Sequence, residues 1–428
     1  MRGHERWSSP ARMWLFQKAL HKMVRTGRLT LVYHDGRTRE FGVETPGRPH
    51  MTIRLHDRSV PMAIVRDPRL GLAEAYMDGR VTIEGGDIMD FVTFMRHDHP
   101  WEWTGDRPKK DKGRHALARR TVSLTGWLIK ANDRRRSRAN VAHHYDLSGA
   151  LYDLFLDKDR QYSCAYWPDA NGGGITLEQA QEDKKAHIAA KLALEPGQRV
   201  LDIGCGWGGM ALYLHRTCGV DVTGITLSEE QLKVARARAR DAGVEDHVRF
   251  ELMDYRDMTG PFDRIVSVGM FEHVGTPHYA EFFRLCHNLL TPDGVMLLHT
   301  IGRMGPPGRT DAFTDKYIFP GGYIPALSEI VAVSEANKLM ITDLETLRLH
   351  YALTLREWYK RTVAHRAEIE AMYDVRFYRM WTFYLAGATA AFETGGMVNY
   401  QIQFCRNRRA LPITRDYMHD AESTLREA

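Results

Sequence analysis

Apolar residues in the second half of the chain alternate between the spacing of strands and the spacing of helices. Short apolar runs that fit buried strands lie at 200–204, 220–227, 248–255, 262–268 and 295–302. Helical periodicity covers the intervening stretches 206–219, 228–243 and 279–294. Strands and helices in strict alternation are typical of a parallel sheet with helices on both faces. The pattern therefore predicts an α/β, doubly wound, Rossmann-like domain that begins near Asn140 and runs to residue 428.

The first 105 residues follow a different pattern. "LTLVYHDGRTREFGV" (29–43) predicts a hairpin, because Asp35-Gly36 supplies a turn between two β-rich runs. Two further strands are expected at 50–57 and 60–67. A helix, a short strand and a second helix are expected over 69–97. We interpret 1–105 as a small α+β domain.

A basic segment, 106–139, joins the two predicted domains. From Asp106 to Arg138 it holds twelve Lys and Arg against three Asp, while the whole chain carries a net charge of only +5. Such a block is either a solvated linker or a surface for a polyanion, which would be nucleic acid or anionic phospholipid. Its apolar stretch "LTGWLIK" favours a membrane interface. The stretch 14–24 is a second candidate, as a basic amphipathic helix.

Composition narrows the class of protein further. The five cysteines are scattered and none has CxxC spacing, so the sequence predicts no disulfide framework, no metal site and a reduced, cytoplasmic compartment. The N-terminus is basic but lacks the apolar run of a signal peptide. No window approaches 18 uninterrupted apolar residues, so we expect no membrane span.

The loop "VLDIGCGWGG" (200–209) carries the first candidate chemistry. Gly204, Cys205 and Gly206 follow an apolar strand, where glycines let the backbone approach a ligand. Asp202 lies two residues earlier and can hold an amino group, and no third glycine completes a pyrophosphate fingerprint. The ligand indicated is S-adenosylmethionine (SAM), with its cationic amino-acid tail. Candidate contacts on the next two strands are Thr226, Leu227 and Gln231, then Tyr255 and Arg256.

Seven motifs in order resemble the cyclopropane-fatty-acid synthases, which are related to the mycolic acid cyclopropane synthases. They are "YSCAYW", "LDIGCGWGG", "GITLSEEQ", "DYRD", "VSVGMFEHVG", "LLHTIG" and "KYIFPGG". The match runs from about residue 140 to the end, and the first domain and linker resemble full-length bacterial synthases more loosely. The resemblance implies methyl transfer from SAM to cis double bonds of membrane phospholipid acyl chains, followed by ring closure.

The same resemblance implies a site for a bicarbonate ion, the base that removes a proton before the ring closes. The matching positions are Cys164, Glu272, His299, Ile301 and Tyr317. Tyr162 and Ser163 match positions that contact SAM. Glu272 and His273 would face opposite ways in an extended strand, and we assign Glu272 to the site. Cys164 is interpreted as a wall of the bicarbonate pocket, with an ordinary core cysteine as the alternative, because the reaction requires no nucleophilic cysteine and no second thiolate offers a metal site.

Other functions stay open at this stage. A different proton loss from the same carbocation would give a methylene- or methyl-branched chain. An RNA methyltransferase would use the basic linker, but no RNA-binding motif is present and we expect no nucleic-acid partner. A lipid-binding protein without activity is the third alternative. The resemblance further suggests a homodimer attached peripherally to the inner, anionic face of the membrane. The double-bond position, the headgroup and the role of residues 1–105 are not predicted.

Overall fold

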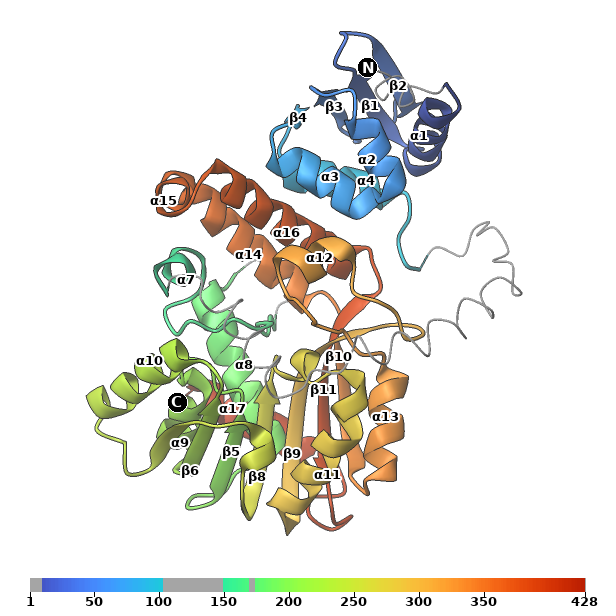
Figure 1. Cartoon of the computed structure of the whole chain (residues 1–428). Coiled ribbons are helices and arrows are strands. Elements are labelled where there is room, and N and C mark those ends of the chain that lie inside the picture. The colour runs from blue at the N-terminus through green and yellow to red at the C-terminus, as the bar shows by residue number, and fades with distance from the viewer. Residues whose placement is uncertain (1–9, 103–148, 169–173, 428) are drawn as a thin grey trace. The chain divides into compact units, whose positions relative to one another are not determined.

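The computed structural model describes residues 10–102, 149–168 and 174–427 of the chain (Figure 1). The basic segment 106–139, predicted as a linker, lies outside the described residues. The chain forms two compact units. One combines Met1–Gly105 with Asp311–Ile318 and Leu355–Gly396, and the other combines Asp106–Thr310, Phe319–Thr354 and Met397–Ala428. Two late segments thus fold with the first 105 residues, and the domain boundaries drawn from the sequence stay a prediction.

The larger unit is built on a seven-stranded sheet with the order β10-β11-β9-β8-β5-β6-β7. The strands β5 to β9 run parallel, and β11 is antiparallel to both β9 and β10. Their bounds are β5 Arg199–Ile203, β6 Asp221–Thr226, β7 Val248–Leu252, β8 Phe262–Val268, β9 Leu290–Arg303, β10 Met340–Leu347 and β11 Met397–Cys405. The predicted Rossmann-like α/β fold is confirmed.

Helices cover both faces of this sheet (Figure 1). On one face, α11 (Tyr279–Leu289) and α13 (Leu327–Ala336) bury their apolar sides against the strands. On the other face, α8 (Leu177–Leu192), α9 (Gly209–Cys218) and α10 (Glu229–Asp241) form a second apolar core. The C-terminal α17 (Asp416–Glu427) packs against α8. The unit also contains α7 (Gly149–Phe155) and the 3₁₀ turns η2 (Tyr255–Asp257), η3 (Phe271–His273) and η4 (Thr276–His278).

The smaller unit contains a four-stranded sheet with the order β2-β1-β3-β4. The predicted hairpin is confirmed: β1 (Gly27–Val32) pairs antiparallel with β2 (Thr38–Val43). The chain also forms β3 (His50–Leu55), then α3 (Pro68–Met77), β4 (Val81–Glu84) and α4 (Ile88–His97), as expected. Helix α1 (Pro10–Met23) precedes the sheet.

The strand predicted at 60–67 is wrong, because these residues form helix α2 (Val60–Arg66). Pro61 has no N–H for a strand ladder but fits the first turn of a helix, where that N–H would have no partner. Asp67 then ends α2 and caps α3, since its side chain accepts hydrogen bonds from the backbone N–H groups of Arg69 and Leu70.

Later segments complete the smaller unit. They contribute α12 (Ala312–Tyr317), the end of α14 (His350–Ala364), α15 (Arg366–Met372) and α16 (Val375–Glu393). Glu74 on α3 accepts hydrogen bonds from Lys316 Nζ at 2.7 Å and from the Tyr317 hydroxyl at 2.9 Å. Asp78, just after α3, pairs with Arg376 at 2.9 Å. These polar contacts hold α12 and α16 on α3.

Candidate functional site

The glycine turn after β5 builds the floor of the site. Gly204 has φ +83°, and a Cβ there would lie 2.8 Å from the Cβ of Met270, so glycine meets both the backbone and the space requirement. The N–H groups of Gly204 and Cys205 both donate to the Ile225 carbonyl, at 2.9 and 3.0 Å. Helix α9 starts at Gly209 directly after this turn.

A single pocket gathers the residues that the sequence assigned to SAM. All eleven line it: Tyr162, Ser163, Asp202, Gly204, Cys205, Gly206, Thr226, Leu227, Gln231, Tyr255 and Arg256. They come from the segment before α8 and from the carboxyl ends of β5, β6 and β7, where open α/β sheets bind ligands. The described structure therefore brings this set together.

Asp202 is one of two acidic residues that line this pocket. Its side chain is 2% exposed, and its Oδ2 has no hydrogen-bond partner among the described residues. Burial raises the pKa of Asp202 to about 7, although Lys184 opposes the shift. A buried carboxylate with one free oxygen fits a cationic ligand group such as the ammonium of SAM, which would stabilise its charged form.

Two hydrogen-bonded pairs hold other residues of the pocket in place. The Thr226 hydroxyl donates to Gln231 Oε1 at 3.0 Å. Arg256 donates from Nε and Nη2 to both oxygens of Asp254, at 2.8 and 2.6 Å, and Asp254 is almost fully buried. The two-pronged pair fixes the guanidinium beside Tyr255. Asp254 also lines the pocket, where it holds Arg256 in place.

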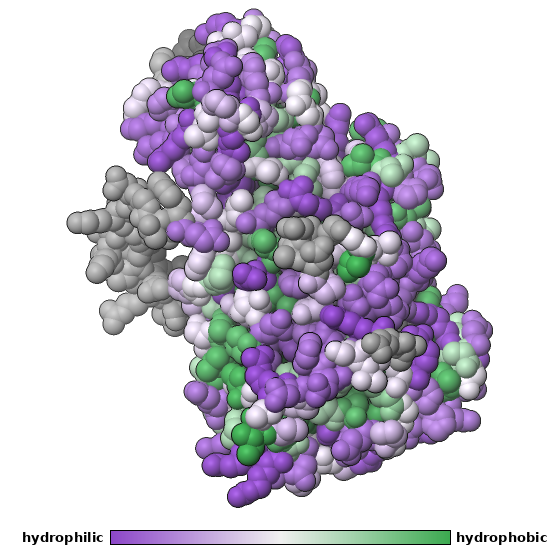
Figure 2. Space-filling model, turned by 180° about the vertical axis from the view of Figure 1, so that it is seen from behind, coloured by the Kyte–Doolittle hydropathy of each residue, from purple (hydrophilic) through white to green (hydrophobic). Residues whose placement is uncertain are grey.

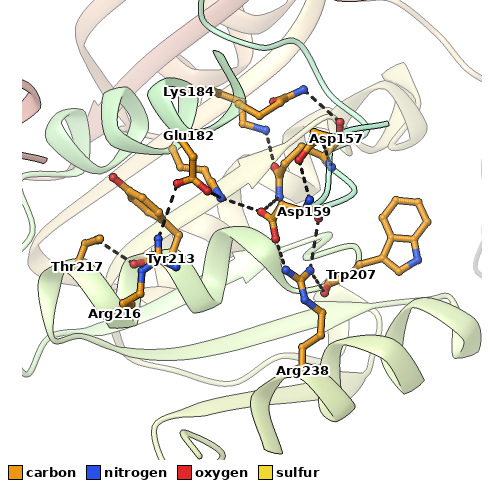
Figure 3. A network of polar contacts seen from close by, with 12 residues as sticks. Asp157, Asp159, Glu182, Lys184, Trp207, Tyr213, Arg216, Thr217 and Arg238 are labelled. Atoms are coloured by element: carbon orange, nitrogen blue, oxygen red, sulfur yellow. Dashed lines mark hydrogen bonds and ion pairs between the residues drawn. The ribbon is translucent and has the colours of Figure 1, made fainter. Parts of the chain in front are cut away.

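Asp159, three residues before Tyr162, lies at the centre of a polar network (Figure 3). Asp159 accepts hydrogen bonds from Lys185 Nζ at 2.8 Å and from Arg238 Nη2. Arg238 also donates to the Trp207 carbonyl at 3.0 Å, which ties α10 to the glycine loop. Burial alone would raise the pKa of Asp159, but Lys185 and Arg238 lower it on balance.

Lys184 supports the same segment from α8. It is fully buried and donates to Ser163 Oγ at 2.8 Å and to Gln161 Oε1. Burial lowers the pKa of Lys184 to about 8. Its ammonium therefore orients two residues that line the pocket without lining the pocket itself.

Replacing Asp159 with asparagine is expected to lower the free energy of unfolding by about 3 kcal/mol, because it leaves two cations without their shared carboxylate. Urea denaturation at pH 7 measures this difference. Glu182→Gln is the matched control. Glu182 also pairs with Lys185 at 2.7 Å, but its side chain is 43% exposed. We expect a loss below about 1 kcal/mol there, and equal losses in the two variants would contradict the prediction.

Two residues of the predicted bicarbonate set are in direct contact. Glu272 lies on the 3₁₀ turn η3 after β8, and its Oε1 accepts a hydrogen bond from the Ile301 backbone N–H at 2.6 Å. Glu272 Oε2 is buried and has no hydrogen-bond partner among the described residues. Burial raises the pKa of Glu272 to about 7. The backbone group expected of Ile301 thus faces Glu272 in this structure.

The other three members of the set have separate surroundings. His299 lies on β9, fully buried, with Asn399 and Gln401 against its two ring nitrogens at 2.8 and 3.2 Å. Cys164 is fully buried, and its thiol donates to the Ala165 carbonyl at 3.3 Å. Tyr317 belongs to the smaller unit, where its hydroxyl donates to Glu74. None of the five predicted bicarbonate residues lines the pocket described above.

Comparison with known proteins decides the family. The family model described as "Mycolic acid cyclopropane synthetase" matches residues 132–402. The chain is 38% identical over 369 residues to the cyclopropane-fatty-acyl-phospholipid synthase of Escherichia coli K12, covering 85% of this chain and 90% of that protein. The chain belongs to the mycolic acid cyclopropane synthetase family. It is accordingly an enzyme of the SAM-dependent methyltransferase class.

Other similar proteins match different shares of this chain. The tuberculostearic acid methyltransferase UfaA1 of Mycobacterium tuberculosis is 32% identical, covering 87% of this chain and 86% of its own. The solved structure of the cyclopropane synthase MmaA2 from M. tuberculosis is 33% identical with a TM-score of 0.59, covering 62% and 97%. That of the mycolic acid cyclopropane synthase CmaA1 with SAH and CTAB is 35% identical with the same TM-score, also covering 62% and 97%. A domain of unknown function matches residues 15–99.

Glu272 was assigned to the site in place of His273 on the assumption that both residues lie in an extended strand, and this assumption was wrong. These residues lie on a 3₁₀ turn, not on an extended strand, so they do not simply point to opposite sides. In this family member Glu272 faces Ile301, while His273 lines the pocket of the SAM set. Burial lowers the pKa of His273 to about 4, so its ring is neutral near pH 7. Sequence reasoning missed His273 as a pocket residue.

Cys164 is expected to be dispensable for the chemistry of this synthetase-family enzyme. Burial raises the pKa of its thiol far above the usual range, and its hydrogen-bond partner is a carbonyl rather than a base. Cys164→Ala should therefore keep kcat within about tenfold, whereas loss of a nucleophile lowers kcat by about 10⁴-fold or more. Steady-state assays of lipid alkylation test this, with Cys218→Ala on α9 as the control. A loss near 10⁴-fold would restore the nucleophile interpretation.

Among the described residues, no cluster of three or more His, Cys, Asp and Glu side chains could hold a metal ion.

Proposed function

We propose that this enzyme transfers the methyl carbon of SAM to the cis double bond of a phospholipid acyl chain and closes a cyclopropane ring. The observation that carries the proposal is the similarity to the E. coli synthase, which extends over 85% of the chain and so covers more than the SAM domain. The pocket that gathers the predicted SAM residues around Asp202 supports the cofactor assignment.

The reaction dictates what the site must do. The alkene π electrons attack the sulfonium methyl, the C–S bond breaks to give S-adenosylhomocysteine, and a carbocation forms on the chain. A proton then leaves the new methyl group and its C–H electrons close the ring. Alignment of the double bond with the methyl group is the main task, because an isolated alkene is a weak nucleophile.

A bicarbonate ion, when bound, would supply the base for that proton. The free oxygen of Glu272 fits such an ion only in part, because two anions side by side repel each other. Because the pKa of Glu272 is about 7, its carboxyl group can be protonated near neutral pH. A protonated carboxyl group donates a hydrogen bond to the ion and does not repel it. Glu272 and His299, which are both buried, would hold the ion.

The second candidate function is a methyl- or methylene-branching fatty-acyl methyltransferase. The 32% identity to the tuberculostearic acid methyltransferase UfaA1 favours it, because that relative covers as much of the chain as the synthase does. The two functions share every step up to the carbocation and differ in which proton leaves.

The deciding experiment incubates the full chain with SAM, bicarbonate and vesicles of a cis-monounsaturated phospholipid, followed by proton NMR of the acyl chains. Upfield ring protons are the expected result. Vinylidene or branched-methyl signals would replace the proposal with the second function. Unchanged lipid, with SAM binding shown separately by calorimetry, would overturn both. A parallel incubation with S-adenosylhomocysteine in place of SAM controls for lipid oxidation.

We further propose peripheral attachment of a homodimer to the cytoplasmic, anionic face of the membrane. No helix of the described residues is long and apolar enough to cross a membrane. Helix α1 buries Phe16 and Leu20 but leaves Trp14 and Leu15 about half exposed, with Lys18 Nζ 4.3 Å from the Trp14 ring. In Figure 2 the described residues show a largely hydrophilic face with scattered hydrophobic spots. Attachment through charge and a few apolar side chains fits these observations.

Charge reversal of Arg134, Arg135 and Arg136 to glutamate is expected to weaken vesicle binding by about 100-fold at low salt, at roughly 1 kcal/mol for each basic residue near the surface. These arginines lie outside the described residues. Co-sedimentation with vesicles containing anionic lipid measures the effect. The control carries glutamate at the exposed Arg240, Arg408 and Arg409, which changes net charge equally. Unchanged binding of the first variant would remove the linker from the attachment surface.

A further inference from the structure

A row of polar side chains, all buried except for the partly exposed Glu345, lies between the sheet and α8. We call it the polar row: Lys191 of α8, Glu345 of β10, Gln401 and Asn399 of β11, and His299 of β9. Gln401 pairs in register with Glu345 on one side and with His299 on the other, so their side chains share one face of the sheet. Lys191, Asn399, Gln401 and His299 are at most 2% exposed. Buried polar groups need partners, so their hydrogen-bond directions are constrained.

Lys191 fixes the orientation of the Gln401 amide. The Lys191 ammonium can only donate, and its Nζ lies 2.9 Å from Gln401 Oε1. The same ammonium also donates to Glu345, which in turn accepts from His187 Nε2 at 2.7 Å. Since its oxygen is occupied by a cation, the Gln401 amide must present its NH₂ group to the next residue in the row.

That residue is His299, and the orientation of Gln401 decides its tautomer. Gln401 Nε2 lies 3.2 Å from His299 Nδ1, so Nδ1 must accept and carries no proton. Burial lowers the pKa of His299 well below its usual value, so the ring is neutral near pH 7. Its one proton therefore lies on Nε2, 2.8 Å from Asn399 Nδ2. Because two donors cannot bond to each other, the Asn399 amide must be flipped so that its oxygen faces Nε2–H, and this also gives the Asn399 oxygen the partner it otherwise lacks.

We propose that Lys191 and Gln401 are positioning residues that fix His299 as the Nε2–H tautomer, so that it meets an anion as a hydrogen-bond donor. The two ring nitrogens differ in how they are held. Nδ1 is tied through Gln401 to a buried cation, whereas the Asn399 side chain makes no hydrogen bond other than the one to His299 among the described residues. Nε2–H is thus the bond that an incoming anion can take over. The link to catalysis rests on the proposed function, in which His299 holds bicarbonate.

The tautomer itself is measured without any activity assay. The full chain is labelled with ¹⁵N-histidine, and long-range proton–nitrogen correlations report which ring nitrogen is protonated. His299→Gln identifies the signals by their disappearance. The expected result for the unmodified protein is a protonated Nε2 and a bare Nδ1. A protonated Nδ1 would overturn the proposal.

Gln401→Glu reverses the polarity at Nδ1 with almost no change in shape. The new carboxylate keeps Lys191 as a partner but can only accept, so the His299 proton should move to Nδ1. Asn399→Asp is the matched control, because it places the same carboxylate on the other nitrogen and should retain the proton on Nε2. If the Gln401→Glu protein does not fold, Lys191→Met replaces it in the experiment. Removing the ammonium frees the Gln401 amide to turn, so His299 should then show both tautomers. An unchanged tautomer in a folded Gln401→Glu protein would also overturn the proposal.

Activity then tests the consequence. We expect Gln401→Glu to lower kcat for lipid alkylation by about 10²-fold or more, with the SAM dissociation constant unchanged, because a wrong histidine tautomer removes catalysis without removing substrate binding. Full activity in a variant with the reversed tautomer would refute the role in catalysis. If the unmodified enzyme does not alkylate lipid, the proposed function fails, while the NMR result still decides the positioning of His299.

Discussion

Glu272→Gln is expected to lower kcat for ring formation by about 10²- to 10³-fold, the range typical of a lost general base, because it alters the site that would hold the bicarbonate ion. Glutamine keeps the size of the side chain and can still accept the Ile301 N–H, but it can neither gain nor lose a proton. SAM binding, measured by calorimetry, should stay within about twofold. Steady-state rates of lipid alkylation measure the loss. A variant with more than a tenth of the original kcat would show that the carboxyl group of Glu272 is not needed to hold the base.

The same substitution should change how stability depends on pH. Because the folded-state pKa of Glu272 is raised to about 7, the folded protein holds a proton that the unfolded chain has already lost between about pH 4.5 and 7. The resulting stabilisation is full below pH 4.5 and is lost as pH rises through 7. Urea denaturation should show the unmodified protein losing about 3 kcal/mol relative to Glu272→Gln across this window. Glu335→Gln on the exposed end of α13 should show no such trend.

Asp202→Asn is expected to weaken SAM binding by about 10- to 100-fold, which corresponds to one charge-assisted hydrogen bond. The pKa of Asp202 is about 7 in the ligand-free protein, and an ammonium beside it favours the carboxylate. Binding should therefore release a proton near pH 7, and affinity should fall as pH drops below 7. Calorimetry in two buffers of different ionisation enthalpy detects the released proton.

The control for this experiment is Asp241→Asn, at an exposed position on α10, which should leave both affinity and proton release unchanged. The Asp202→Asn protein should bind SAM with an affinity that no longer changes between pH 6 and 8. A variant that keeps full affinity, or a protein that releases no proton, would show that Asp202 holds no cationic group of the ligand.

The site residues that could be predicted from the local sequence pattern are those at the ends of strands. Each parallel strand is followed by its own loop, and the strand order of an α/β sheet brings those loops together. Asp202, Thr226 and Tyr255 could therefore be placed in one pocket without knowing any long-range contact. The hairpin could also be predicted from the sequence, because Asp35-Gly36 has a strong preference for a tight turn.

The roles of other residues could not be predicted from the sequence, because they depend on contacts between distant segments of the chain. Lys184 and Lys191 look like solvent-facing positions of a polar helix. Only the packing of Lys184 against the segment 161–163, and of Lys191 against β10 and β11, shows that they are buried. Gln401 is chosen as a partner of His299 by the register of β9 and β11, which lie a hundred residues apart. The prediction of an extended strand at Glu272 was wrong for a local reason. A short apolar run is compatible with both a strand and a 3₁₀ turn.

The polar row also has a consequence for how this sequence can change. Lys191 shares Glu345 with His187, and Gln401 shares Lys191 with Glu345, so no member can be replaced without altering the partners of another. Effects of substitutions within such a network do not add. A change tolerated at one of these positions in one relative can be harmful in another, because its acceptability depends on the residues already present at the other positions.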